Sequence, residues 1–154
     1  MKNNLLLGVL VGLTLVGSAA SGKEPVVPRS FIGLSFDESI YSCTQFFIKS
    51  IDLQLSVLHE RPNTLSQQNS LRSFVKMKTN TLMYINVEVA DDRREAAKAV
   101  IGDDVTVEAN DVIQYCVAMS NTSQEKMTPK VRKLANDYAK AEADKLLRSA
   151  GSIK

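Results

Sequence analysis

The chain has no tryptophan, one histidine and two cysteines among its 154 residues, and only 6% of its residues are aromatic. A single imidazole, His59 beside Glu60, does not supply the three or four ligands of a zinc site. The scarcity of aromatic rings leaves little for a surface that stacks on bases or sugars. The glycines of the chain after residue 22 are isolated and form no Gly-rich phosphate loop. We therefore expect no metal and no cofactor.

Catalytic motifs are also missing. His59 is the one imidazole base for any Ser or Cys nucleophile, and no Gly-x-Ser-x-Gly elbow occurs. Cys43 precedes His59 by sixteen residues, which is about 24 Å along a continuous helix. We expect no catalytic residue and a protein that is not an enzyme. Paired carboxylates stay open as an alternative, a small hydrolase, because seventeen acidic residues permit many spatial pairs.

The chain lacks an excess of charge of either sign. Residues 23–154 hold 18 Lys and Arg against 17 Asp and Glu. A nucleic-acid-binding protein needs clustered basic residues, so nucleic acid is not expected as a partner. The same balance gives no reason to propose an anionic membrane surface.

What the chain does have, at its start, is the pattern of a secretory signal peptide over residues 1–22. Lys2 supplies the positive n-region, and residues 5–16 form an uncharged apolar run too short for a comfortable membrane span. Small residues follow, with cleavage predicted after Ala20 or after Gly22. No cysteine lies near either cut, so a lipid anchor is not expected. The interpretation is a periplasmic or secreted bacterial protein with no stable membrane insertion after cleavage.

An exported chain with one pair of cysteines is expected to form a disulfide, here Cys43–Cys116. The loop between them spans 73 positions, and the chain-entropy model assigns such a closure roughly 4 kcal/mol. Neither cysteine belongs to a Cys-x-x-Cys motif, which argues against thiol oxidoreductase chemistry.

The remainder predicts one helical domain over residues 35–151, after an extended lead-in over 23–34 that contains Pro25 and Pro28. Ser35 and Glu38 have the spacing of a capping box, and apolar residues recur at steps of three and four from there to Leu58. Pro62 disfavours helical geometry at Arg61, so this helix should end near Glu60.

Residues 74–90 fit two patterns. A helical stripe runs from Leu71 to Val89 and is flawed at Lys78, whereas residues 83–89 alternate as a strand does. Helix is favoured because the neighbouring segments are helical, and a hairpin over 74–90 is the alternative. The fold class is therefore mostly α, a bundle of three to five helices with one disulfide, or α+β if the hairpin forms.

The second half of the chain predicts further helices. Residues 90–101 should be helical, and Asp111 should cap a short helix that ends before a polar loop over 121–126. Thr128 and Pro129 start the last helix, which Gly151 ends. One face of that helix is expected to carry the apolar residues Val131, Leu134, Ala135, Tyr138, Ala141 and Ala150. Asp144 should pair with Arg148, and residues 152–154 should fray.

These features favour a non-catalytic protein-binding accessory of the cell envelope: an adaptor, an immunity protein or a chaperone-like protein. The oligomeric state stays open. The expected partner, another envelope or secreted protein, would contact an exposed apolar patch made of Leu71, Phe74, Met77, Leu82, Met83 and Tyr84. The alternative is a carrier of a small apolar ligand, held in a cavity of about 300 Å³ or more lined by residues such as Phe47, Phe74 and Ile85.

Overall fold

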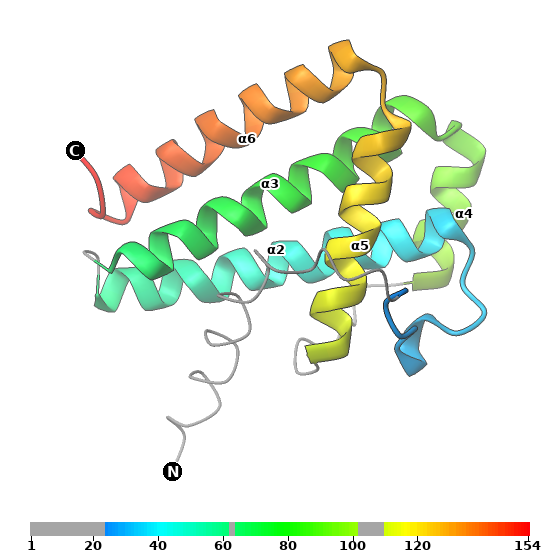
Figure 1. Cartoon of the computed structure of the whole chain (residues 1–154), viewed down its shortest axis with the longest axis horizontal. Coiled ribbons are helices and arrows are strands. Elements are labelled where there is room, and N and C mark those ends of the chain that lie inside the picture. Colours follow the sequence, from blue (N-terminus) through cyan, green and yellow to red (C-terminus); the bar gives the residue numbers. More distant parts are fainter. Residues whose placement is uncertain (1–23, 62–63, 102–109) are drawn as a thin grey trace.

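A computed structural model describes residues 24–61, 64–101 and 110–154. These residues form α-helices and one short 3-10 helix and contain no strand (Figure 1), which confirms the mostly α fold and excludes a hairpin over 74–90. The elements are η2 (Arg29–Phe31), α2 (Phe36–Glu60), α3 (Leu65–Glu88), α4 (Asp91–Ile101), α5 (Asn110–Lys126) and α6 (Pro129–Ser149). The predicted signal peptide, residues 1–22, lies outside the described residues.

The first long helix begins and ends where the sequence predicts. Ser35 is its N-cap: the Ser35 N–H donates to the Glu38 carboxylate at 2.7 Å, and the Glu38 N–H donates to the Ser35 hydroxyl at 3.3 Å. This reciprocal capping box satisfies two of the backbone donors that a helix start leaves unpaired. Ahead of it, the lead-in contains the 3-10 helix η2, whose Phe31 is buried against Tyr115 with ring centroids 4.7 Å apart.

Helix α3 is central to the bundle, and this position explains its ambiguous sequence. It contacts α2, α5 and α6, so apolar residues are needed on several of its sides and do not form one clean stripe. Lys78, the flaw in the helical pattern, lies at the edge of the α6 contact and forms an ion pair with Glu142. Near its end, Ile85 and Val89 are buried whereas Val87 is 51% exposed, so the strand-like alternation of apolar residues does not follow which side chains are buried.

Helix α5 is longer than expected. Residues 121–126 continue it to Lys126, so the prediction of a loop there was wrong. Ser120 and Ser123 are fully buried, and the Ser123 hydroxyl donates to the Ser120 carbonyl at 2.8 Å, so these polar residues are accommodated inside the helix. Asp111 does not cap this helix; it lies in the first turn, and its carboxylate accepts from the Val112 N–H.

Helix α6 has the predicted start and stop signals. The Thr128 hydroxyl accepts from the Val131 N–H, Pro129 occupies the first turn, and Gly151 has the positive φ of 73° that ends many helices. Residues 152–154 were wrongly expected to fray. Ser152 is buried, its carbonyl accepts from Gln68 of α3, and Ile153 packs against the core, so the chain end is attached to the start of α3.

Large side chains and the disulfide form the main core between α2, α3 and α5. Phe46, Phe47 and Phe74 are fully buried, with the Phe47 and Phe74 ring centroids 6.3 Å apart. The predicted Cys43–Cys116 disulfide is confirmed: the sulfurs are 2.05 Å apart and join α2 to α5.

Helix α6 is attached to the bundle differently. It runs along the outer side of α3 and packs chiefly on that helix (Figure 1). Its buried residues recur every four positions and are mostly small: Ala135, Ala139, Ala143 and Leu147. The predicted apolar face was wrong in three residues, since Leu134, Tyr138 and Ala141 lie on the exposed side. Asp144 is also bound differently from the prediction, because it forms an ion pair with Arg72 of α3.

Candidate functional site

The partner surface predicted from the sequence is mostly inside the fold. Leu71 and Phe74 are fully buried, and Met77 and Tyr84 are each 8% exposed. As a surface, this prediction is wrong for those four residues, because α2, α5 and α6 together cover the sides of α3 that carry them. Of the six, only Leu82 is exposed, at 39%, while Met83 is half-buried.

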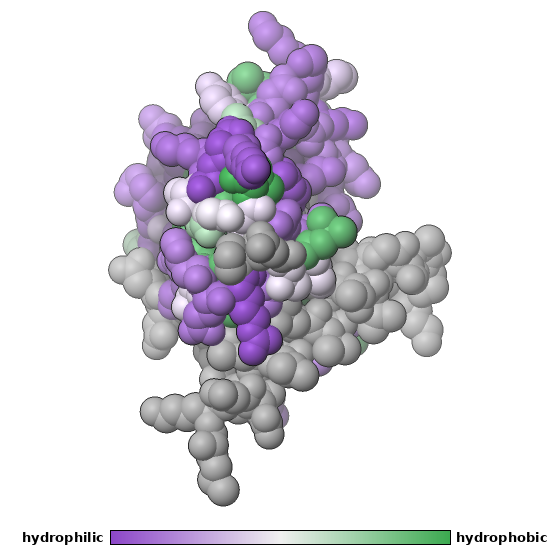
Figure 2. Space-filling model, turned by 90° about the vertical axis from the view of Figure 1, so that its left-hand side faces the viewer, coloured by the Kyte–Doolittle hydropathy of each residue, from purple (hydrophilic) through white to green (hydrophobic). Residues whose placement is uncertain are grey.

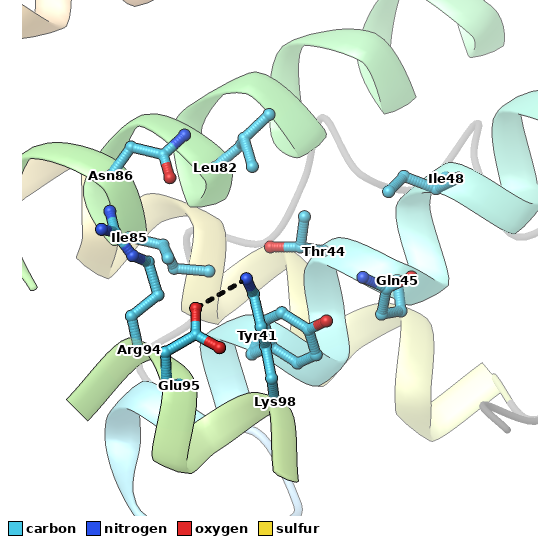
Figure 3. Close-up of a pocket in the computed structure, with 10 residues that line it drawn as sticks. All are labelled: Tyr41, Thr44, Gln45, Ile48, Leu82, Ile85, Asn86, Arg94, Glu95 and Lys98. Atoms are coloured by element: carbon cyan, nitrogen blue, oxygen red, sulfur yellow. Dashed lines mark hydrogen bonds and ion pairs between the residues drawn. The ribbon is translucent and has the colours of Figure 1, made fainter. Parts of the chain in front are cut away.

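Leu82 borders a cavity of about 480 Å³ between α2, α3 and α4 (Figure 3). Its lining comes from Tyr41, Thr44, Gln45 and Ile48 of α2, Leu82, Ile85 and Asn86 of α3, and Arg94, Glu95 and Lys98 of α4. We call this the α2–α4 groove. It arises because α4 follows α3 closely and turns back against α2, which leaves a hollow among the three helices.

One wall of the α2–α4 groove is apolar and the other is charged. Ile48, Leu82 and Ile85 give the apolar wall, and Ile48 and Leu82 are themselves more than a third exposed. Between α2 and α3 the hydroxyl oxygens of Thr44 and Thr81 lie 2.8 Å apart, at hydrogen-bonding distance, and Thr44 also donates to the Ile40 carbonyl. These bonds hold the two helices together beside the cavity without leaving the buried hydroxyls unpaired.

The charged wall belongs to α4. Lys98 binds Glu95 at 2.9 Å, as Figure 3 shows, and Arg94 binds Asp91. Each cation therefore has a carboxylate partner one turn away, and the wall carries no large excess of charge. The groove is suited to a small molecule with an apolar body and a hydrogen-bonding head.

This cavity corrects the ligand site predicted from the sequence. The expected position, between the first helix and the segment containing Ile85, is occupied by the groove, and Ile85 lines it. Phe47 and Phe74 do not line it, because both are fully buried in the main core. Helix α4, which supplies the charged wall, was not included in the prediction because its mixed charges are typical of a solvated helix.

Outside the α2–α4 groove, a cluster of polar and aromatic side chains lies where α2 begins and α3 ends. We call this cluster the polar corner. Asp37 binds Arg93 of α4 at 3.2 Å, and the Tyr84 ring meets Phe36 edge-on at 5.5 Å. Burial, and then the negative charge of Asp37, raise the pKa of Tyr84 above its ordinary value. Tyr84 consequently stays a neutral phenol at physiological pH, and the corner serves to fasten α4 to the bundle.

The residues weighed for catalysis are not brought together. Cys43 and Cys116 are joined in the disulfide, and His59 lies exposed in the last turn of α2. Within the ranges that the structure describes, no group of three His, Cys, Asp or Glu side chains has a metal-binding arrangement. No helix in those ranges is long and apolar enough to cross a bilayer.

Sequence reasoning missed the outer side of α6. Leu134 is 46% exposed and Tyr138 is 59% exposed, one turn apart on the side away from α3. The four-residue spacing of Ala135, Ala139 and Ala143 could have revealed this, because a repeating stripe of small residues is typical of closely packed helices and assigns Leu134 and Tyr138 to the other side.

Comparison with known proteins finds no matching family model, no similar curated protein and no similar solved structure.

Proposed function

We propose that the protein is an exported, non-catalytic accessory of the bacterial cell envelope that binds another protein, as an adaptor, immunity or chaperone-like component. The observation that carries the proposal is the exposed pair Leu134 and Tyr138 on a helix whose opposite side is fully used in packing. Tyr138 carries most of the weight, because exposed aromatic side chains are enriched at protein–protein contacts, and Leu134 adds apolar surface beside it.

The disulfide supports a location in the periplasm or outside the cell. A Cys43–Cys116 bridge persists in the periplasm or outside the cell and is rare in a reducing cytosol. The N-terminal residues 1–22 have the pattern of a cleavable signal peptide. We expect the mature protein in a periplasmic or culture-medium fraction, with an N-terminus at Ser21 or Lys23. Intact-mass measurement of the protein from that fraction checks this, and a full-length cytosolic protein would contradict it.

Photo-crosslinking in intact producing cells tests the binding role. A photoreactive phenylalanine derivative is placed at Tyr138, at Leu82 in the α2–α4 groove and at Gln114, which is exposed on α5. We expect one discrete envelope protein to be captured. Absence of a protein adduct at all three positions would contradict a protein-binding role. Tyr84 is unsuitable for the label because it is buried.

The α2–α4 groove favours a second candidate, a carrier of a small amphipathic ligand. Its volume of about 480 Å³ lies within the range of small-molecule sites. Native mass spectrometry of the protein purified from its own compartment should then show a bound small molecule. Ile48→Trp, which fills the groove, should release the molecule. Gln114→Trp, at an exposed position of α5, should retain it. Protein isolated without any adduct would remove this candidate.

A further inference from the structure

Charge is separated in this molecule although its total is nearly balanced. Helices α3 and α6 carry nine basic residues, Arg72, Lys76, Lys78, Lys130, Arg132, Lys133, Lys140, Lys145 and Arg148, against four acidic ones, Glu88, Asp137, Glu142 and Asp144. The other three helices, α2, α4 and α5, carry five basic residues against nine acidic ones: Asp37, Glu38, Asp52, Glu60, Asp91, Asp92, Glu95, Asp111 and Glu125. The balanced net charge therefore conceals an excess of basic residues on α3 and α6 and an excess of acidic residues on α2, α4 and α5.

The acidic residues of α6 are already engaged. Asp137 binds Lys133 at 2.6 Å, Glu142 binds Lys78, and Asp144 binds Arg72. Lys130, Lys140, Lys145 and Arg148 form no salt bridge within the described part of the chain. The positive charge of α6 is consequently left facing away from the bundle.

Three of these cations, Lys130, Lys145 and Arg148, share a side of α6 with the exposed apolar pair. Positions 130, 134, 138, 141, 145 and 148 follow one another at steps of three and four, which places them on one helical face. We call this the outer α6 face. It has Leu134 and Tyr138 at its centre, with Lys130 before them and Lys145 and Arg148 after them. These five residues and Ala141, which completes the face, are all exposed, because α6 packs on α3 through its opposite side.

Building on the proposed protein-binding function, we propose that the outer α6 face docks an acidic segment of the partner protein. Leu134 and Tyr138 act as anchors for apolar side chains of that segment, and the cations on both sides attract its carboxylates. Charges at the rim of a contact steer the encounter and select partners of opposite sign, while buried anchors supply most of the affinity.

A protein partner fits this face better than an anionic membrane. A helix that lies in a bilayer surface buries a whole apolar side, and the apolar side of α6 is occupied by α3. Figure 2 shows the molecule from the end where the C-terminus lies: the coloured residues at this end are largely hydrophilic, and the hydrophobic ones among them form small, separated groups. Two large apolar side chains suffice as anchors for a protein and are few for membrane insertion.

The decisive experiment combines the Tyr138 crosslink with charge reversal. K130E/K145E reverses two of the three outer cations, and R29E/R61E makes the same change of net charge at exposed positions outside α3, α6 and the α2–α4 groove. Lys130 lies in the first turn of α6, where the helix dipole favours a glutamate, and Lys145 is exposed. Arg29 and Arg61 are exposed as well, so both variants should fold. Circular dichroism confirms this before crosslinking.

We expect the Tyr138 label to capture a protein whose crosslinked peptide is rich in Asp and Glu. K130E/K145E should weaken binding of that identified protein by about tenfold and reduce its salt dependence, while R29E/R61E leaves both unchanged. Equal weakening by the two variants overturns the proposal. Capture only at Leu82 or Gln114 also overturns it but leaves the proposed binding function intact, whereas no capture at any position contradicts both.

Two further controls identify other occupants. Vesicles containing about one third phosphatidylglycerol should not bind the mature protein; binding that K130E/K145E abolishes would assign the face to lipid and overturn the proposal. Light scattering across a concentration series should show no increase in the molecular mass of the protein. Head-to-tail assembly, with the outer α6 face of one copy on the acidic helices of the next, would overturn it as well.

Discussion

The main core and the contact between α6 and α3, which we call the α6 seam, hold their helices together by different means. Between α2, α3 and α5, fully buried phenylalanines surround a disulfide. Between α6 and α3, by contrast, small alanines recur every fourth residue, and ion pairs from Arg72 and Lys78 cross the edges of the contact. The seam residues Ala139, Ala143 and Leu147 extend the same core, but their mostly small side chains determine which side of α6 packs on α3 and which side remains exposed.

Removing the disulfide, which belongs to the main core, should have the largest effect on stability. C43A/C116A should lower the free energy of unfolding by about 4 kcal/mol, because the unfolded chain regains the entropy of a 73-position loop. Denaturant unfolding followed by circular dichroism measures this. Reduction of the wild-type protein by dithiothreitol should give a similar loss. A variant as stable as the oxidised protein would mean that the phenylalanine core alone holds α2 and α5 together.

Enlarging a seam residue should have an intermediate effect. Ala139 is 5% exposed and lies on the buried stripe of α6. Ala139→Leu should destabilise the protein by about 1–3 kcal/mol, because the close approach of α6 to α3 leaves no room for three more carbon atoms. Asn136→Leu, on an exposed position of the same helix, is the control and should change stability by less than about 0.5 kcal/mol. Equal effects of the two variants would show that the seam is loosely packed.

The Arg72–Asp144 pair should have a smaller, pH-dependent effect. A hydrogen bond from Arg72 lowers the pKa of Asp144 below its ordinary value. A carboxylate with a lowered folded-state pKa stabilises the protein at pH values above its unfolded pKa, and that contribution is lost as the pH falls through the folded value. Asp144→Asn should therefore be less stable than wild type at pH 7. When the free energy of unfolding of each protein is plotted against pH, the two curves should converge below about pH 4. Parallel curves over the whole range would contradict the pairing.

Truncating the outer α6 face should have the smallest effect on folding. L134A/Y138A should change the free energy of unfolding by less than about 0.5 kcal/mol for each residue, since both side chains are exposed and contribute little to the core. Leu147→Ala on the buried side of the same helix should cost at least about 2 kcal/mol. Thermal unfolding of the two variants measures the contrast. A large loss in L134A/Y138A would show that this face supports the fold and is not available to a partner.

The α2–α4 groove illustrates the limit of reading a site from one sequence. Its apolar wall comes from α2 and α3, and Ile85 belonged to the predicted ligand site. The charged wall comes from α4, whose residues Arg94, Glu95 and Lys98 are an ordinary mixed-charge run in the sequence. Only the turn after α3, which folds α4 back against α2, places that run beside a hollow.

Local signals in the sequence determined where α2 and α6 start and where α6 stops. Ser35 with Glu38, Thr128 with Pro129, and Gly151 each act within one turn, through backbone hydrogen bonds or backbone conformation, so they can be recognised without knowing the fold. The Cys43–Cys116 bridge was predictable for a similar reason, since an isolated pair has one pairing.

Tertiary structure alone decided which sides of those helices face the interior. Leu71 and Phe74 are apolar on a helix that three others cover, and they are buried; Leu134 and Tyr138 are apolar on a helix that packs chiefly on one neighbour, and they are exposed. Burial depends on how many neighbouring helices surround each side, and residues distant in the chain set that number. The sequence therefore determined the helices and their covalent link, and the packing of α6 on α3 decided which surface is left for a partner.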